Sequence, residues 1–331
     1  MKKRVAWIDI LKGFAIFLVV FNHSVQRTMA GLENSDEILA EIEFFIKSFY
    51  MPLFFFCSGC VYALRPKANP RKIDLVYIKN KAVDLLIPYV FFAVLVWVGK
   101  MVFSNYVTVN VSFSDLLEMF INPIAFLWFI YILFFVSVLV YILDCNFEKR
   151  WQVTLILLVM TLSRCFITTG IKLIDRVLFY PIFYYMGVLF FENRNKIKKA
   201  TPAIIGLIFA VVYVLYYRYS QIMLLTIIVN SLGVLFFSTI FYLIFRNVEK
   251  PCVLSYLGCN TLYIYIIHPV VLDAFRVLLL SIGTMKSELF WVCSLSVVGL
   301  ICSIIYIELS KKIWVLDLPF KPRKTISNLK K

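Results

Sequence analysis

The sequence predicts an all-α polytopic membrane protein, with about ten transmembrane helices in a single bundle and with both the N- and C-termini in the cytoplasm. Hydrophobic residues make up 62% of the 331 residues and charged residues 16%, whereas a soluble domain is about half apolar and about a quarter charged. The apolar residues come in blocks of roughly the 20 residues that a helix needs to cross a bilayer. A block in lipid must satisfy its own backbone hydrogen bonds, so helices are the expected spanning form.

The apolar blocks give ten candidate spans. We place them at 6–26, 44–64, 82–103, 124–143, 152–169, 177–191, 202–218, 222–245, 257–281 and 288–309. The fifth and sixth are short, and charged residues such as Arg164 and Asp175 interrupt them, so a count of eight or nine spans stays open. The first block is too long for a signal peptide and no small-residue cleavage site follows it, so we expect it to be retained as a span.

The distribution of Lys and Arg favours ten spans with cytoplasmic ends. If the N-terminus is cytoplasmic, 24 of the 34 Lys and Arg residues fall on the cytoplasmic side and 9 on the outer side, and Lys12 lies within the first span. Cytoplasmic loops of membrane proteins carry such an excess. The net charge of +15 therefore indicates a basic inner surface, next to anionic lipid or able to bind a polyanionic ligand. Nucleic-acid binding is not expected, because no soluble basic domain is present to carry it.

The loops are too short to form a separate soluble domain. The longest polar stretches are 27–43, 65–81, 104–123 and 310–331, and none could bury a core of its own. We therefore expect one membrane domain over residues 1–331. The eight cysteines show no metal-ligand spacing, and Cys57 and Cys60 lie within a span without the context of a redox motif. No metal site is predicted.

The two histidines are the most informative residues of the chain. His23 and His268 both lie inside long apolar stretches. An ionisable group within a membrane span is costly unless it faces a protein or water-filled interior, so it is a functional-site hypothesis by default. The unperturbed pKa of an imidazole suits proton transfer near neutral pH. The sequence thus predicts acid–base chemistry within a helical bundle.

Three polar residues of the first span share one face of the helix. Lys12 and His23 are separated by eleven positions, which is about three turns plus 20° and about 16 Å of rise. Asp9 precedes Lys12 by three residues and lies on the same face. This polar stripe should face the protein interior. Alternatively, Asp9 and Lys12 form only a local pair near the membrane interface.

A basic segment connects the second and third spans. Its cations are Arg65, Lys67, Arg71, Lys72, Lys79 and Lys81. They are consistent with an ordinary cytoplasmic loop. They could instead bind phosphates through charge-assisted hydrogen bonds. A donor such as coenzyme A, which carries a 3′-phosphate and a pyrophosphate, would suit this surface.

Four motifs occur in an order typical of one enzyme family. They are Asp9-Ile-Leu-Lys12-Gly13 followed by His23, Met51-Pro-Leu-Phe-Phe-Phe-Cys-Ser58-Gly59, Leu127-Trp128-Phe129, and Asn260-Thr-Leu-Tyr-Ile-Tyr265-Ile-Ile-His268. In these motifs nearly the whole chain resembles the acyltransferase-3 family of multi-span O-acyltransferases, in particular the branch related to fucose 4-O-acetylases. Many members have Arg where this chain has Lys12, and Lys lacks the planar two-point fork of Arg.

The resemblance implies transfer of an acyl group, usually acetyl from acetyl-CoA or another short acyl-CoA, to a hydroxyl of a cell-surface or lipid-linked sugar at the plasma membrane (the inner membrane in bacteria). On that basis Lys12, Arg65, Lys79 and Lys81 hold the donor. His23 is the general base, and His268 is a second catalytic or thioester-positioning residue. Supporting roles are expected for Asp9, Ser58, Trp128, Asn260 and Tyr265.

Two other classes of function stay open at this stage. A secondary transporter or a flippase for a saccharide-type substrate would share the ten spans and the rare buried charges. A non-enzymatic assembly or channel component would not need the histidines. Neither the acceptor sugar, the acyl group, the number of chemical steps nor the oligomeric state is defined by the sequence.

Overall fold

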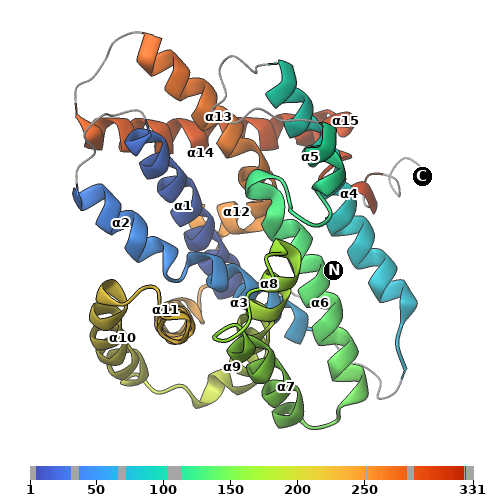
Figure 1. Ribbon diagram of the computed structural model, residues 1–331, viewed down its shortest axis with the longest axis vertical. Coiled ribbons are helices and arrows are strands. Elements are labelled where there is room, and N and C mark those ends of the chain that lie inside the picture. The colour runs from blue at the N-terminus through green and yellow to red at the C-terminus, as the bar shows by residue number, and fades with distance from the viewer. Residues whose placement is uncertain are drawn as a thin grey trace. The chain divides into compact units, whose positions relative to one another are not determined.

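The computed structural model describes residues 5–30, 37–65, 72–102, 113–250, 252–281, 287–323 and 325, and none of them lies in a β-strand (Figure 1). Within these ranges, nine segments are long and apolar enough to cross a membrane. They are α1 (Ala6–Met29), α2 with α3 (Glu37–Lys47 and Tyr50–Ala63), α4 (Leu75–Val102), α6 (Trp128–Asn146), α8 with α9 (Lys172–Phe179 and Pro181–Asn193), α10 (Thr201–Arg218), α11 (Met223–Phe245), α13 (Thr261–Ser281) and α14 (Glu288–Lys312). An all-α polytopic membrane protein is confirmed.

The fifth expected span, 152–169, is wrong as a full-length helix. Helix α7 (Arg150–Ser163) has 14 residues, about 21 Å of rise, while the hydrocarbon core is about 30 Å thick. The helix ends because the following residues form a polar turn. Arg164 Nη1 lies 2.8 Å from Asp175 Oδ1, which also accepts hydrogen bonds from the backbone N–H and the hydroxyl of Thr169 at 3.0 and 2.9 Å. Apolar composition alone did not reveal this charged pair.

The chain forms two compact units that interleave in sequence. The first contains residues 1–64 and 186–309, and the second contains residues 65–185 and 310–331. Each is described here by itself. The single membrane domain expected over 1–331 stays a prediction.

Helix α1 is the packing centre of the first unit. One side of its N-terminal half contacts the short helix α12 (Val253–Cys259) so closely that only glycine fits at two positions. A Cβ atom added to Gly13 would lie 1.8 Å from the carbonyl oxygen of Leu254, and one added to Gly258 would lie 1.7 Å from that of Asp9. Small residues that let helix backbones approach are typical of packing in membranes.

Helices α13 and α14 run in opposite directions beside α1. Along α13 the residue numbers of the contacts rise with those of α1, because His268 lies beside His23 and Asp273 binds Arg27. Helix α14 is antiparallel to α13, since Trp291 packs with Leu279 and the Gly299 position faces Leu272. Helix α14 therefore ends near the beginning of α1.

That shared end is fixed by a hydrogen bond. The Tyr256 hydroxyl, on α12 beside the start of α1, lies 2.5 Å from Glu308 Oε1 near the end of α14. Burial and the Glu308 carboxylate raise the pKa of Tyr256 to about 12, so its hydroxyl stays protonated at neutral pH and donates. The start of α1 and the end of α14 thus lie at the same end of the first unit.

The second unit is held together by tyrosines. The Tyr89 hydroxyl on α4 donates to the carbonyl of Met119 at 2.5 Å, and that of Tyr131 on α6 donates to Phe120 at 3.0 Å. The two rings stack with centroids 4.5 Å apart. These contacts fix the connection that contains α5 (Phe113–Glu118) and η2 (Ala125–Leu127). The remaining short elements of the chain are η3 (Arg194–Lys196) and α15 (Trp314–Asp317).

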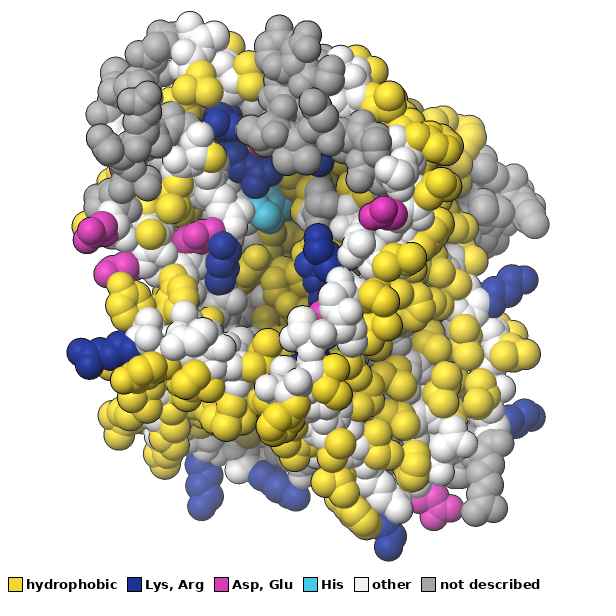
Figure 2. Space-filling view, in the orientation of Figure 1, with side chains coloured by type: hydrophobic (Ala, Val, Ile, Leu, Met, Phe, Trp, Pro, Cys, Tyr) yellow, Lys and Arg dark blue, Asp and Glu magenta, His cyan; other side chains and the backbone are white. Residues whose placement is uncertain are grey.

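The surface is apolar in the way expected for contact with lipid. Hydrophobic side chains cover much of the face shown in Figure 2. Helix α10 is the clearest case among the long helices, because Leu207 is 70% exposed and Phe209 is its one buried residue. A helix that exposes such side chains along its length would not be stable in water, so lipid is the partner that this face requires.

Candidate functional site

The structure brings the two histidines together. His23 lies on α1 and His268 on α13, and their ring centroids are 5.3 Å apart with 42° between the ring planes. The parallel packing of α1 and α13 produces this pair, since each imidazole faces the other helix. Two imidazoles in contact inside one helical unit are rare enough to mark the candidate site.

His268 is fully buried and has one ring nitrogen bound. Its Nδ1 lies 2.6 Å from the carbonyl oxygen of Ile264, one turn earlier on α13. Its Nε2 has no hydrogen-bond partner among the described residues. Leaving a buried polar atom without a partner costs about 1–3 kcal/mol. Such an atom in a histidine pair therefore points to a ligand or a water that binds there.

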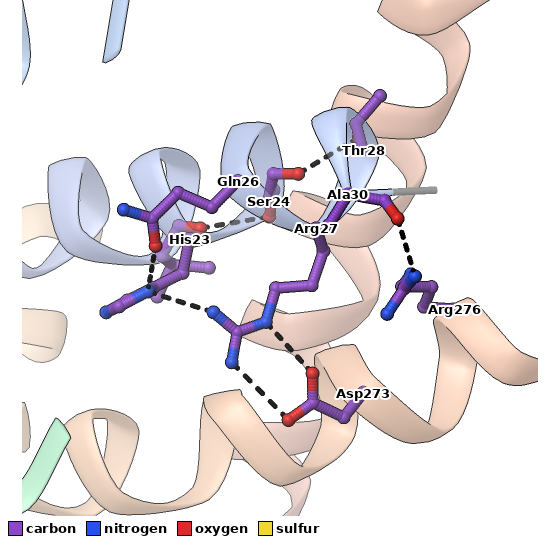
Figure 3. Close-up of polar contacts among 9 residues, drawn as sticks. His23, Ser24, Gln26, Arg27, Thr28, Ala30, Asp273 and Arg276 are labelled. Carbon is purple, nitrogen blue, oxygen red and sulfur yellow. Dashed lines mark hydrogen bonds and ion pairs between the residues drawn. The ribbon is translucent and has the colours of Figure 1, made fainter. Parts of the chain in front are cut away.

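His23 is half-buried and lies in a polar network on the same helix (Figure 3). Its Nδ1 is 3.0 Å from Gln26 Oε1 and 3.1 Å from Arg27 Nη1. Gln26 Nε2 donates in turn to Glu43 Oε1 at 2.7 Å. A histidine side chain is visible from outside in Figure 2, with Lys or Arg side chains next to it. Because His268 is 0% exposed, this ring is that of His23.

Arg27 and Asp273 connect the two helices beside the histidines. Arg27 Nε and Nη2 lie 3.0 and 3.4 Å from the two carboxylate oxygens of Asp273, in a two-point contact (Figure 3). The Arg27 side chain is 19% exposed and that of Asp273 is 61% exposed. The sequence reasoning missed Gln26, Arg27, Glu43 and Asp273. Arg27 follows His23 by four residues and so shares its helix face, a signal that was overlooked because 27 was placed outside the first span.

Lys12 and Asp9 form an ion pair away from the histidines. Lys12 Nζ lies 3.1 Å from Asp9 Oδ1, with side chains 22% and 15% exposed. This is the local pair that the sequence left as an alternative. Eleven residues of α1 separate Lys12 from His23, about 16 Å of rise. The predicted polar stripe thus has two separate polar clusters along one helix.

The other predicted residues of the first unit differ in how near they lie to the pair. The Tyr265 ring is buried and its centroid is 6.4 Å from that of His268. Asn260 lies at the break between α12 and α13, and its Nδ2 donates to the carbonyl of Tyr256 at 2.9 Å. The Ser58 hydroxyl donates to the carbonyl of Phe54 on its own helix at 2.9 Å. Of these three, Tyr265 is the one in contact range of the histidines.

The remaining predicted residues belong to the second unit. The Arg65 guanidinium lies over the Tyr77 ring, 4.1 Å from its centroid. Lys79 and Lys81 are on the first turns of α4, where Lys79 is exposed. The predicted cations at positions 67 and 71 lie outside the described residues.

Trp128, also in the second unit, begins α6. The Arg176 guanidinium lies over its ring at 4.2 Å, a cation–π contact that fixes the ring. This places the tryptophan in a structural contact within its own unit.

Among the described residues, no group of three or more His, Cys, Asp and Glu side chains is arranged to hold a metal ion. The cysteines at 57 and 60 are buried, and the thiol of Cys60 donates to the carbonyl of Gly187 at 3.3 Å. Both therefore pack as small side chains in the interior of the first unit.

Residues 5–308 match the family described as "Acyltransferase domain", Acyl_transf_3. The chain belongs to the acyltransferase-3 family. It is 24% identical over 312 residues to the inner membrane protein YcfT of Escherichia coli (strain K12), which covers 85% of this chain and 83% of that protein. No solved structure matches the chain. The match contains all four motifs that carried the resemblance, and it makes the protein a multi-span member of a membrane acyltransferase family.

Proposed function

We propose that this acyltransferase-3 protein moves a short acyl group, in the first instance acetyl, from cytosolic acyl-CoA to a hydroxyl of a cell-surface or lipid-linked sugar. Family membership supports acyl transfer in general. The observation that carries the proposal is the histidine pair, in which the two imidazoles of the chain lie 5.3 Å apart on α1 and α13.

A pair of imidazoles meets the two chemical needs of acyl transfer to an alcohol. A base must accept the hydroxyl proton, and a donor must stabilise the negative charge that develops on the carbonyl oxygen. The hydroxyl oxygen bonds to the acyl carbon, the carbon–sulfur bond breaks, and the coenzyme A thiolate leaves and takes up the proton. Two rings at the observed separation can contact one reacting carbonyl group from two sides.

The basic residues support a donor that enters from the cytoplasm. Lys12 lies about 16 Å from His23 along α1, and the extended pantetheine arm of coenzyme A can cover such a distance. A thioester at the histidines would then have its phosphates near the cytoplasmic end of the helix. Arg65, Lys79 and Lys81 of the second unit are the further cations proposed to bind these phosphates. Asp9 would have to share Lys12 with the donor, because the two are paired.

We place the protein in the plasma membrane, which is the inner membrane in a bacterium with two membranes. The relative YcfT is named an inner membrane protein. In that location the acyl-CoA pool faces the basic side of the protein, while the sugar acceptor is reached from the lipid or from outside. Both substrates then meet within the bundle.

The test uses the purified full-length protein in nanodiscs, with acetyl-CoA or succinyl-CoA and a panel of sugar acceptors. We expect acceptor-dependent release of the coenzyme A thiol and a mass increase of the sugar by one acyl group. His23→Ala and His268→Ala should each reduce the rate by about 10²-fold or more, with unchanged thermal unfolding. Ser281→Ala removes an exposed hydroxyl at the end of α13 and should keep the wild-type rate.

Two results would contradict the proposal. Full turnover by both histidine variants would remove the proposed site. Movement of a saccharide across proteoliposomes with no acyl-CoA present and no thioester consumed would instead identify a transporter or flippase.

A further inference from the structure

The two histidines differ in the kind of partner that each binds. The Ile264 carbonyl, 2.6 Å from His268 Nδ1, can only accept a hydrogen bond. In the neutral ring the proton must therefore be on Nδ1, and Nε2 must have the lone pair. That Nε2 is buried and has no partner among the residues described. His268 thus presents an atom that is ready to accept a proton.

The Nδ1 atom of His23 has two neighbours with opposite demands. Gln26 Oε1, at 3.0 Å, can only accept, so it favours a proton on Nδ1. Arg27 Nη1, at 3.1 Å, can only donate, so it requires a lone pair there. The Gln26 amide cannot turn round to relieve the conflict, because its Nε2 donates to the Glu43 carboxylate. One of the two neighbours must prevail.

Arg27 is the stronger partner. A hydrogen bond from a charged donor is roughly twice as strong as one between neutral groups. The Arg27 guanidinium is also held in place by both oxygens of Asp273 on α13 (Figure 3). Arg276, three residues further along α13, donates to the carbonyl of Ala30 at 2.9 Å and so fixes the end of α1 against the same helix. The His23 proton is therefore assigned to Nε2.

We propose that His268 is the general base of the transfer and that His23 is its hydrogen-bond donor, with Arg27 and Asp273 as the residues that position His23. This assignment rests on the proposed acyl transfer and reverses the role that the sequence predicted for His23. His268 Nε2 accepts the hydroxyl proton as the hydroxyl oxygen bonds to the acyl carbon. His23 donates through Nε2 to the carbonyl oxygen as it becomes negative. His268 then returns the proton to the coenzyme A thiolate as the carbon–sulfur bond breaks.

Nitrogen NMR of the imidazoles reads the two tautomers directly. The chain has two histidines, so protein labelled with ¹⁵N-histidine and held in nanodiscs near pH 8 gives two rings without background. Protonated and unprotonated ring nitrogens resonate in separate ranges, and spectra of His23→Gln and His268→Gln assign the rings. We expect opposite tautomers, with the proton on Nε2 in His23 and on Nδ1 in His268. The same tautomer in both rings would overturn the proposal.

Variants of the network show which neighbour sets the His23 tautomer. Arg27→Gln and Asp273→Asn should move the His23 proton to Nδ1, where Gln26 accepts it, and should leave His268 unchanged. Gln26→Leu is the matched control, because it removes the competing neighbour and should leave the proton on Nε2. A tautomer change in Gln26→Leu with none in Arg27→Gln would show that Gln26, not Arg27, positions the ring.

Rates of the glutamine variants test the assigned roles. The Gln amide N–H can replace the Nε2–H of His23 but cannot accept a proton in place of His268. We therefore expect His268→Gln to lose about 10²-fold or more in kcat and His23→Gln to lose about tenfold or less. The reverse order, or equal losses, would overturn the assignment while leaving acyl transfer intact. Absence of any thioester consumption by the wild-type protein would instead refute the proposed function, whatever tautomers the spectra show.

Discussion

The contact between α1 and α12 makes Gly13→Ala the sharpest test of the fold around the site. A Cβ atom at Gly13 would lie 1.8 Å from the Leu254 carbonyl oxygen, and 3.0 Å from the Leu254 Cα. Carbon and oxygen atoms of neighbouring helices approach to about 3.3–3.6 Å. The added methyl group therefore requires α1 and α12 to separate by roughly 1.5 Å. No side chain can give way instead, because both contacted atoms are backbone atoms.

The expected loss of stability is about 1–3 kcal/mol, the usual cost of forcing extra volume into a well-packed interior. The effect should also reach the histidines. Helix α12 continues through Asn260 into α13, which carries His268. A misplacement of about 1 Å near reacting groups can cost about 10²-fold in rate. We therefore expect Gly13→Ala to lower both the unfolding temperature and the rate of acyl transfer per folded molecule.

Thermal unfolding in detergent and acyl-transfer rates in nanodiscs measure the two effects separately. Gly99→Ala on α4 is the matched control, since no described atom lies within 4 Å of the added Cβ. Ala is the better helix former, so this control should be neutral or more stable by up to about 1 kcal/mol. Wild-type stability of Gly13→Ala would refute the close contact. Lower stability with an unchanged rate would show that α12 does not set the position of His268.

Three further predictions concern other parts of the first unit. The Asn22 side chain is fully buried with no partner for its amide among the described residues, so Asn22→Leu should leave the unfolding temperature equal or higher; a lower temperature would reveal a partner. Lys12→Met leaves the Asp9 carboxylate without its cation and should destabilise the protein more than the double change with Asp9→Asn; the opposite order would show that the pair contributes nothing. Topology reporters fused to each end of the full-length chain should both report the cytoplasm, and reporters on opposite sides would contradict an even number of crossings.

Nine of the ten spans could be predicted because lipid imposes one rule on every residue of a span. Hydropathy adds up along the chain, and a helix is the form that satisfies the backbone in lipid. The fifth span failed because its end depends on a specific interaction, the pair of Arg164 with Asp175. A sum over apolar residues cannot show whether two charges eleven residues apart will bind each other.

The histidines could be identified one by one, whereas their pairing could not be predicted. Each imidazole is unusual within its own span, so it is visible in a single segment of sequence. Their contact depends on how closely α12 approaches α1, which is determined by Gly13 and Gly258. Arg27 was missed for a related reason. A cation near the end of a span is ordinary in sequence, and its role is visible once Asp273 of another helix lies beside it.

Charge distribution and helix packing give independent arguments for a tenth crossing. The start of α1 and the end of α14 lie at the same end of the first unit, where Tyr256 binds Glu308. A chain that enters and leaves a membrane on one side crosses it an even number of times, so the nine long segments need one more.

Helix α7 is the one shorter apolar helix of the described chain that can supply this crossing. Its length of about 21 Å puts the following turn, with Arg164 and Asp175, below the membrane surface. Charged residues persist at that depth when they bind each other, and these two side chains are 9% and 17% exposed in their ion pair. The charged turn that shortens the helix is thus also what lets a short helix complete the crossing, since a membrane thinned at that point covers the remaining distance.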